Sequence, residues 1–422
     1  MARKMKDSGI EWIGEIPEGW ELIKAKYLFS QRNEKGNSTL VLLSPTQKYG
    51  VIPQSQLEGV VQVKENTDLR AFKTIHIGDF VISLRSFQGG FEFSNYEGVC
   101  SPAYQVLHAT KDLSNDFFRY LFKSDGFISK INSLTVGIRE GKNIQYWDFS
   151  NMLLALPPKE IQIRSAQYLN AKCTEIDTML SKTRSSIEEY KKLKQAVITQ
   201  AVTKGVRGER EMKDSGVEWI GEIPKEWVCE KIKYATSISR GLFNHRPRND
   251  ERYYNGKYPF IQTGDVANAT KYIVSYSQTL NELGKSVSKE FPKGTLTMTI
   301  AANVGDVAIL NFDAYFPDSV VGFVPNKNIR TLYLFYVFSA MKDEFIRTAI
   351  KSTQLNLNID RVKETFIPVT LNVNEQCEIE NFLESKCAEI DGLIAKKEQL
   401  VKELESYKKS LIYEVVTGKR EV

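Results

Sequence analysis

Apolar residues recur every seven positions along two long segments of the chain, near residues 161–207 and 372–422. From Ile161 to Thr203 the first segment contains neither proline nor glycine, the residues that interrupt helices most strongly. Such heptads are typical of helices that pack along a narrow stripe. We therefore predict two long helical arms, whose stripe residues are Ile176, Leu180, Ile187, Tyr190 and Val197, and Ile390, Ile394, Val401, Leu404 and Leu411.

A helix with one apolar stripe has to bury it against a partner. Polar residues, among them Lys194 and Lys408, fill the remaining stripe positions. The first predicted arm leads into the second globular segment, and the second arm begins where that segment ends. Pairing within one chain would therefore be antiparallel, and it would bring Val422 close to Met1. The alternative is a coiled coil between two copies of the chain.

The chain contains an internal repeat, which marks its domain organisation. Residues 5–30 and 212–237 are identical at 17 of 26 positions. A second match, Lys172–Asp177 against Lys386–Asp391, continues to the ends of the predicted arms at an offset of 214. The sequence thus predicts globular domains at 1–160 and 208–371, with arms at 161–207 and 372–422.

The two middle segments, 31–155 and 238–370, barely resemble each other. Short β-like runs at 78–84 and 294–300 are each followed by a glycine-containing turn, at 88–90 and 303–306. An aromatic, helix-like stretch comes later in each, at 117–131 and 332–350. We predict an α+β fold with two pseudo-twofold-related globular domains, separated by an antiparallel pair of long helices.

Composition limits the chemistry available to the chain. It carries only three histidines and five widely spaced cysteines, so we expect no metal site, no disulfide framework and packed, reduced thiols. No phosphate-binding loop, amino-methyltransferase tetrapeptide or hydrolase motif occurs. We expect no catalytic residues. No apolar run is long enough for a membrane span and no signal peptide opens the chain, so we expect a cytoplasmic location.

Polar residues gather in the predicted loops of both middles. Arginine, asparagine and glutamine are the side chains that form paired hydrogen bonds with base edges, and the net charge of +5 permits a polyanion partner. The alternative for each residue is an ordinary solvated loop. The candidate DNA contacts are Arg85, Gln88, Arg139, Lys142, Asn143, Arg240, Asn244, His245, Arg246, Arg248, Asn303, Gln354, Asn356 and Asn358.

The repeated opening motif, Glu11–Trp20 and Glu218–Trp227, resembles that of specificity subunits of type I restriction-modification enzymes. The run Tyr258–Asp265 and the Gln-Leu-Asn-Leu-Asn-Ile-Asp run at 354–360 resemble that family as well. The resemblance covers essentially the whole chain, although Tyr258–Asp265 has no clear counterpart in the first half. The paired tryptophans of the opening motifs either pack onto the arms, as we expect, or contact a partner.

The resemblance implies two target-recognition domains that each read one half of a split double-stranded DNA site. Dissimilar domains imply an asymmetric site. Two methyltransferase subunits and two motor-nuclease subunits would join the chain, and S-adenosylmethionine, ATP and Mg would bind to those partners only. The remaining hypotheses are a subunit that serves modification alone, a protein-protein adaptor with two variable heads, and an enzyme with an unrecognised site.

Overall fold

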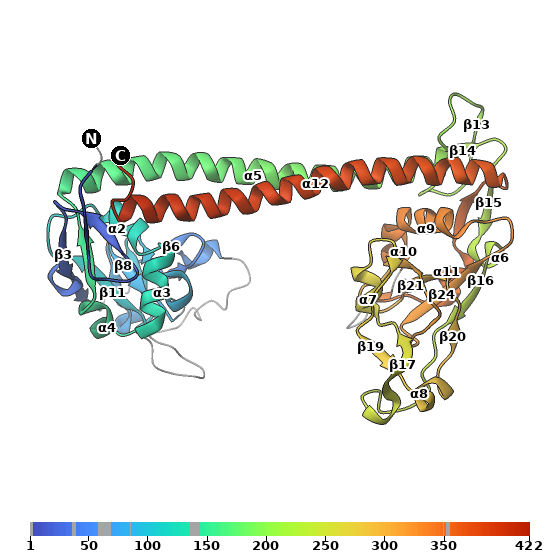
Figure 1. The fold of residues 1–422 in the computed structure, drawn as a ribbon, viewed down its shortest axis with the longest axis horizontal. Coiled ribbons are helices and arrows are strands. Elements are labelled where there is room, and N and C mark those ends of the chain that lie inside the picture. The colour runs from blue at the N-terminus through green and yellow to red at the C-terminus, as the bar shows by residue number, and fades with distance from the viewer. Residues whose placement is uncertain are drawn as a thin grey trace. The chain divides into compact units, whose positions relative to one another are not determined.

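The computed structural model describes residues 3–35, 39–57, 69–84, 86–134, 144–348, 350–351 and 355–422. The chain divides into two compact units (Figure 1). Unit 1 comprises Met1–Arg184 and Glu398–Val422, and unit 2 comprises Ser185–Lys397. The predicted arms are two long helices, α5 (Lys159–Lys204) and α12 (Val373–Val416), and each helix contributes one part to either unit.

The two helices pair antiparallel inside unit 1. The Lys408 ammonium donates to the Asp177 carboxylate at 2.6 Å, and Arg184 pairs with Glu405. Residue numbers therefore rise along α5 as they fall along α12. The stripe residues Ile176, Leu180 and Leu411 are buried in the core of unit 1, with Val401 and Leu404 partly buried beside them.

The same pairing recurs inside unit 2. Lys194 donates to Asp391 at 2.6 Å, and the Lys397 ammonium lies 5.7 Å from the centre of the Tyr190 ring. Of the predicted stripe residues, Ile187 and Ile390 are buried, and Val197 and Ile394 are half-buried. Ile198, which was not predicted, is more buried than Val197. The antiparallel pairing predicted within one chain is thus confirmed in each unit.

The polar residues of the stripe form ion pairs between the two long helices, and these pairs are repeated in the two halves of the chain. Lys194 and Lys408 are equivalent at the offset of 214, and so are their partners Asp391 and Asp177. Exposed ion pairs stabilise a fold by less than about 1 kcal/mol. Charged pairs beside a coiled-coil stripe nevertheless select one register and direction.

The repeated opening motifs fold as small hairpins that pack onto the arms. β1 (Met5–Asp7) pairs with β2 (Glu15–Pro17), and β13 (Met212–Asp214) pairs with β14 (Glu222–Pro224). Trp20 and Trp227 are buried, and Trp12 and Trp219 are half-buried, so these residues pack as expected.

The C-terminal end of α12 packs against the N-terminal hairpin within unit 1. The Tyr413 hydroxyl donates to the Ile13 carbonyl at 3.1 Å, and Val422 packs against the core of unit 1 (Figure 1). The prediction that Val422 lies near Met1 involves a residue outside the described ones. The contacts of Ile13 already bring the two ends of the described chain together.

Each unit carries a globular head that is closed by a two-stranded ribbon. In unit 1 the ribbon pairs β3 (Glu21–Lys24) with β12 (Leu153–Leu156), and in unit 2 it pairs β15 (Val228–Lys231) with β27 (Phe366–Val369). Just beyond the ribbons, Ala25 N donates to Met152 O at 2.8 Å and Ile232 N donates to Thr365 O at 3.0 Å. We call residues 25–152 head 1 and residues 232–365 head 2.

The main sheets of the two heads share the order of their first four strands, and head 2 adds a fifth strand. In head 1 the order is β4 (Phe29–Arg32), β11 (Gln105–Ala109), β8 (Phe80–Ile82) and β9 (Glu92–Phe93). In head 2 it is β16 (Thr236–Arg240), β24 (Val320–Pro325), β21 (Leu296–Thr299), β22 (Val307–Leu310) and β18 (Tyr272–Ile273). The first strand of each head therefore pairs with a late strand, which pairs in turn with the middle one.

The two aromatic stretches are each two helices rather than one. The first is α2 (Asn115–Leu121) and α3 (Asp125–Leu134), and the second is α9 (Thr331–Ala340) and α10 (Lys342–Thr348). In the turn between α2 and α3, the Leu121 carbonyl accepts from both the hydroxyl and the backbone N–H of Ser124, at 2.7 and 3.1 Å. The predicted turn at 88–90 is likewise partly helical, because Gln88 and Gly89 lie in α1 (Ser86–Gly89).

Equivalent glutamines join each head to its arm. Gln162 and Gln376 are buried in the first turns of α5 and α12. The Gln162 side chain accepts from Ser114 N at 2.9 Å, and that of Gln376 accepts from Arg330 N at 2.8 Å. In both cases the glutamine accepts a hydrogen bond from the backbone N–H of the residue that precedes the aromatic helix. Each head is therefore joined to its arm by the same type of contact.

The remaining elements surround these sheets. In unit 1 they are η1 (Ala25–Tyr27), β5 (Leu43–Thr46), β6 (Gly50–Pro53), η2 (Gln54–Gln56), η3 (Leu69–Ala71), β7 (Lys73–Ile75), β10 (Gly98–Cys100) and α4 (Tyr146–Ser150). In unit 2 they are α6 (Ile232–Ala235), η4 (Glu251–Tyr253), β17 (Tyr254–Phe260), α7 (Thr263–Asn268), β19 (Gln278–Leu280), α8 (Glu282–Ser286), β20 (Glu290–Phe291), β23 (Ala314–Tyr315), β25 (Ile350–Lys351), β26 (Leu355–Asn356) and α11 (Ile359–Glu364).

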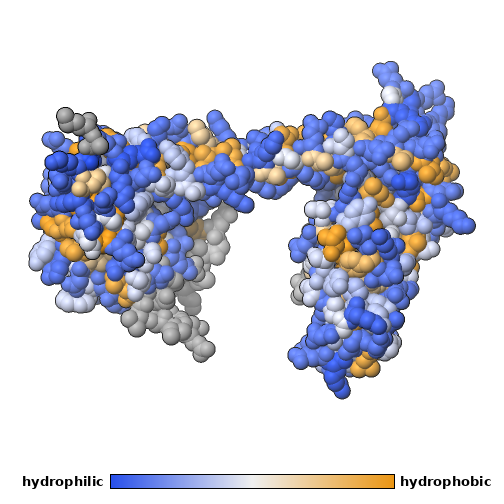
Figure 2. Space-filling model, in the orientation of Figure 1, coloured by the Kyte–Doolittle hydropathy of each residue, from blue (hydrophilic) through white to orange (hydrophobic). Residues whose placement is uncertain are grey.

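Hydrophilic residues cover most of the visible face of each unit (Figure 2). Across the described part of the chain, no helix combines the length and apolarity that a membrane crossing requires. Burial raises the pKa of the Cys173 and Cys387 thiols, which pack in the cores of units 1 and 2. A raised thiol pKa disfavours the reactive thiolate.

Candidate nucleic-acid interface

Three segments of head 2 meet at one edge of its main sheet. β16 ends at Arg240 opposite Val321, and β21 ends at Thr299 opposite Val320, so both strands finish where β24 begins. Beyond the strands, Ile300 N donates to Ser319 O at 3.0 Å and Leu357 N donates to Ile300 O at 2.8 Å. This head 2 edge therefore gathers the predicted segments 240–248, 303 and 356–358.

A cluster of arginines occupies the edge. Arg240 Nε donates to the Asp318 carbonyl at 2.5 Å, the Arg246 guanidinium lies 3.6 Å from the Asp318 carboxylate, and Arg248 pairs with the same carboxylate. We call Arg240, Arg246 and Arg248 the arginine cluster. Its guanidinium groups have the charge and geometry that bind phosphate oxygens.

Gly241 allows the cluster to form. A Cβ atom at this position would lie 2.2 Å from the Pro317 carbonyl oxygen, closer than real contacts permit. Gly241 N donates to Val320 O and Leu242 N donates to Phe316 O, which draws the arginine-bearing segment alongside residues 316–318. Asp318 is thereby placed among the arginines, although it is 70 residues from Arg248 in sequence.

Some predicted contacts have structural roles at this edge. His245 Nε2 lies 2.9 Å from the Asp250 carboxylate, and its ring stacks on Tyr253 at 3.9 Å between centres. The Asn358 side chain accepts from Asp360 N at 2.8 Å and caps α11. The side chains of Asn244 and Asn303 are exposed and remain candidates for contact with a ligand.

The equivalent edge of head 1 is built in the same way. β4 and β8 end where β11 begins, because Gln105 lies opposite Ile82 and Val106 opposite Arg32. The buried Gln105 side chain donates to Ile144 O at 3.0 Å and accepts from Tyr146 N at 2.7 Å. This head 1 edge therefore joins the ends of β4 and β8 to the segment that follows residue 143.

Gln88 is the predicted contact of head 1 that lies within the described residues. The exposed Gln88 side chain lies in α1, with its carbonyl oxygen 3.5 Å from the Gln47 amide. The Lys123 ammonium anchors α1 by donating to Gly89 O at 2.7 Å and to Glu92 at 2.7 Å. Burial raises the pKa of Glu92 to about 7, against the opposing effect of Lys123.

Several predicted contacts cannot be located. Arg85, Arg139, Lys142, Asn143 and Gln354 lie outside the described residues. Asn356 is described only through its backbone, which pairs with Ile350 in the β25–β26 hairpin. These candidates stay predictions.

A pocket of about 430 Å³ opens at the head 1 edge, and sequence reasoning did not find it. Trp147 stands beside it with 72% of its surface exposed. Its wall carries amides, one ammonium group and aromatic rings, contributed by Gln31, Lys73, Gln105, Gln145, Tyr146 and Trp147. Long-range strand pairing and the side-chain hydrogen bonds of Gln105 bring these residues together, so no local sequence pattern signals the pocket.

The described residues contain no cluster of side chains that could bind a metal ion. Among the residues that the structure describes, no group of three or more His, Cys, Asp or Glu side chains could hold a metal ion. The head 2 edge offers guanidinium groups that suit a polyanion, and the head 1 edge offers amides, aromatic rings and the Lys73 ammonium.

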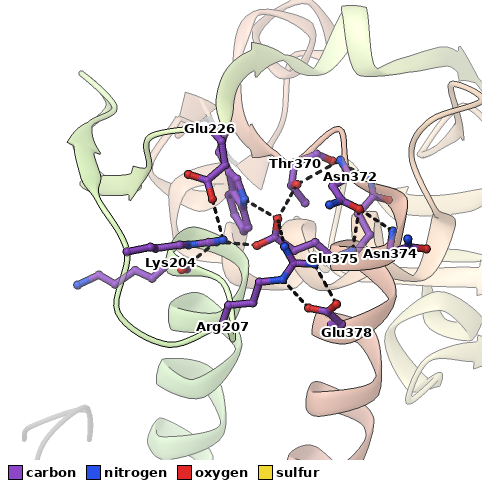
Figure 3. Close-up of polar contacts among 11 residues, drawn as sticks. Lys204, Arg207, Glu226, Thr370, Asn372, Asn374, Glu375 and Glu378 are labelled. Carbon is purple, nitrogen blue, oxygen red and sulfur yellow. Dashed lines mark hydrogen bonds and ion pairs between the residues drawn. The ribbon is translucent and has the colours of Figure 1, made fainter.

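The junction of the second opening motif with α12 holds a buried ionic network. The Glu375 carboxylate accepts from Arg210 at 2.6 Å, from Trp227 Nε1 at 3.2 Å and from the Thr370 hydroxyl at 3.0 Å (Figure 3). The Glu375 side chain is only 2% exposed, and that of Arg210 is 13% exposed. One turn further along α12, the exposed Glu378 pairs with Arg207 at 2.7 Å.

Comparison with known proteins gives a consistent picture. Residues 238–403 match the family model described as type I restriction modification DNA specificity domain. The type I restriction enzyme MjaVIII specificity subunit of Methanocaldococcus jannaschii is 22% identical over 430 residues, which cover 96% of this chain and 93% of that relative.

Solved structures share the fold at lower identity. A chain from a study of the complex assembly and conformational transition of the type I R-M system has a TM-score of 0.73 and 14% identity, covering 95% of this chain and 98% of that one. The HsdS subunit from Thermoanaerobacter tengcongensis has a TM-score of 0.56 and 15% identity, covering 98% and 100%. The chain thus matches the specificity-domain model over residues 238–403, and it is similar along nearly its whole length to type I restriction enzyme specificity subunits.

Proposed function

We propose that the chain recognises a bipartite, asymmetric DNA site, with head 1 reading one half and head 2 the other. The observation that carries this proposal is the equivalence of the two head edges. Both gather loops at the same edge of a sheet with the same strand order, yet their side chains differ. Equivalent frames with different side chains suit two different half-sites.

The repeated scaffold suggests where the partners bind. The opening motifs are identical at 17 of 26 positions, and the helical arms share their heptads and their Lys–Asp pairs, so each copy offers an equivalent surface to one of two methyltransferase subunits. Motor-nuclease subunits would complete a restriction complex. We propose that S-adenosylmethionine, ATP and Mg bind to those partners, that this chain contributes no catalytic residue, and that it acts on DNA in the cytoplasm.

Binding of the purified chain to a random duplex at graded salt tests the proposal. With about four phosphate contacts, the affinity should fall at least about 100-fold between about 50 and 200 mM salt, because each contact releases counterions. The measurement is fluorescence anisotropy of a labelled duplex. An adaptor that binds proteins would show no DNA affinity at any salt concentration, with or without methyltransferase subunits.

Two variants that each remove one positive charge sharpen this test. Arg248→Gln should lower the salt slope by about one, because Arg248 belongs to the arginine cluster. Lys225→Gln should leave the slope unchanged, since Lys225 is an exposed residue that pairs with Glu211 in the opening motif. If the two variants have equal salt slopes, the head 2 edge does not contact DNA.

A further inference from the structure

The arginine cluster is already occupied by an acidic group of the chain itself. The Asp318 carboxylate lies between Arg246 and Arg248, and the Asp318 carbonyl accepts from Arg240. Carboxylate and phosphate oxygens are the acceptors that guanidinium groups bind with the same planar geometry. Asp318 thus stands where a phosphodiester would bind.

Arg246 and the backbone of Arg248 have contacts that do not involve Asp318. Arg246 Nη1 donates to Phe243 O at 2.6 Å and to His245 O at 2.8 Å, while its Nη2 faces Asp318. The Tyr254 hydroxyl donates to the Arg248 carbonyl and fixes the backbone there. The Arg246 guanidinium and the Arg248 backbone can therefore stay in place when the carboxylate leaves, and Arg240 binds the backbone carbonyl of Asp318 rather than its carboxylate.

The contacts to Asp318 are also exposed enough to be exchanged. The side chains of Arg246, Arg248 and Asp318 are 54%, 45% and 35% exposed. Exposed ion pairs add little to folding stability. The carboxylate should lower the affinity for DNA, because its negative charge repels a phosphate. It also has to be displaced from the arginine cluster before a phosphate can bind.

We propose that the arginine cluster is a phosphodiester-binding site and that Asp318 is its internal placeholder, displaced by the DNA backbone on binding. The inference rests on the proposed DNA-binding function. Asp318 would weaken binding to DNA in general, because a phosphate contact carries no sequence information. A chain that must search long DNA for rare sites benefits from weaker non-specific binding.

The test compares Asp318→Asn with the wild-type chain on a random duplex at graded salt. Asparagine keeps the size and the backbone carbonyl of Asp318 but not its charge. The affinity at about 0.1 M salt should rise about 3- to 10-fold, and the salt slope should steepen by about one, as expected for one additional uncompensated phosphate contact. Thermal unfolding should stay unchanged, since surface substitutions rarely alter stability.

Two further variants separate the placeholder from a general charge effect. Asp313→Asn removes the same charge from an exposed residue of head 2 whose carboxylate accepts from Lys293 N, and it should change affinity less than twofold. In an Arg246→Gln, Arg248→Gln background, Asp318→Asn should have no more effect than Asp313→Asn.

The outcomes are distinct. If the wild-type chain binds DNA and Asp318→Asn binds no better than Asp313→Asn, or binds more weakly, the placeholder role is wrong and the proposed function stands. If neither the wild-type chain nor Asp318→Asn binds DNA at any salt concentration, the proposed function fails and the inference fails with it.

Discussion

Replacing Glu375 with alanine should lower the free energy of unfolding of unit 2 by about 3–5 kcal/mol, the usual consequence of breaking a buried ion pair. The variant leaves the Arg210 guanidinium and the Trp227 indole N–H without their buried acceptor. Hydrogen–deuterium exchange followed by mass spectrometry suits the measurement, because it reports on peptides of unit 2 and unit 1 separately. Exchange should accelerate in peptides of the second opening motif.

Glu378→Ala provides the matched control for this prediction. It removes the same side chain one helical turn away, but Glu378 and its partner Arg207 are 46% and 41% exposed. The expected loss is below about 1 kcal/mol. Similar losses for the two variants would mean that the Glu375 network does not stabilise the junction.

The Glu375 prediction applies to one half of the chain only. At the offset of 214, Ile161 stands in α5 where Glu375 stands in α12. Arg3 lies over Trp20 at 5.7 Å, as Arg210 lies over Trp227 at 5.4 Å. Yet Trp20 Nε1 is buried and has no hydrogen-bond partner among the described residues. The first junction is therefore held by apolar packing, and the substitution at Glu375 should leave it unaffected.

Exchange of head 1 for the head of a relative should change one half of the methylated DNA site and leave the other half unchanged. The structure sets the boundaries of the exchange at residues 25–152, between the paired strands β3 and β12. Cutting there keeps the β3–β12 ribbon, the arms and the second unit of the chain intact. The expected effect is a complete change of specificity in one half-site, measured by sequencing methylated DNA from cells that carry the chimaera.

The reciprocal exchange of head 2, residues 232–365, is the control. It should change only the other half-site, and a chimaera with both exchanges should take both new halves. A single exchange that alters both half-sites would show that the heads do not read independently. Loss of all methylation would be uninformative unless the reciprocal chimaera also failed, so both chimaeras are needed.

The scaffold could be predicted from sequence because its signals are local. Heptads and the absence of proline and glycine identify α5, and the repeat identifies α12 as its counterpart. Chain order then gave the antiparallel direction. The role of Lys194 and Lys408 did not follow from the pattern, because a polar stripe residue looks like a defect until its partner on the other helix is known.

The common sheet order of the two heads was hidden in the sequence. β8 carries Phe-Val-Ile and β21 carries Leu-Thr-Met-Thr, so equivalent strands share no residues. The equivalent glycines Gly78 and Gly294, with φ of +93° and +85°, precede both strands and were the one common signal. Strand order depends on long-range pairing, which short strands in a mixed fold do not encode locally.

The candidate site was predictable in part. Arg240, Arg246 and Arg248 stand out as a basic run, and the structure brings them together at one edge. Asp318 could not be found from sequence, since only the pairing of β16 with β24 places it there. His245 and Asn358 were chosen for their residue type, and their neighbours Asp250 and Asp360 engage them in local structure.

The most direct test of the account is a map of methylated bases in the genome of a host that carries this chain together with the methyltransferase subunits proposed to join it. The account predicts one asymmetric motif in two parts, separated by bases that are not read, and its loss when the chain is removed. A continuous or palindromic motif, or methylation that persists unchanged without the chain, would contradict recognition by two different heads.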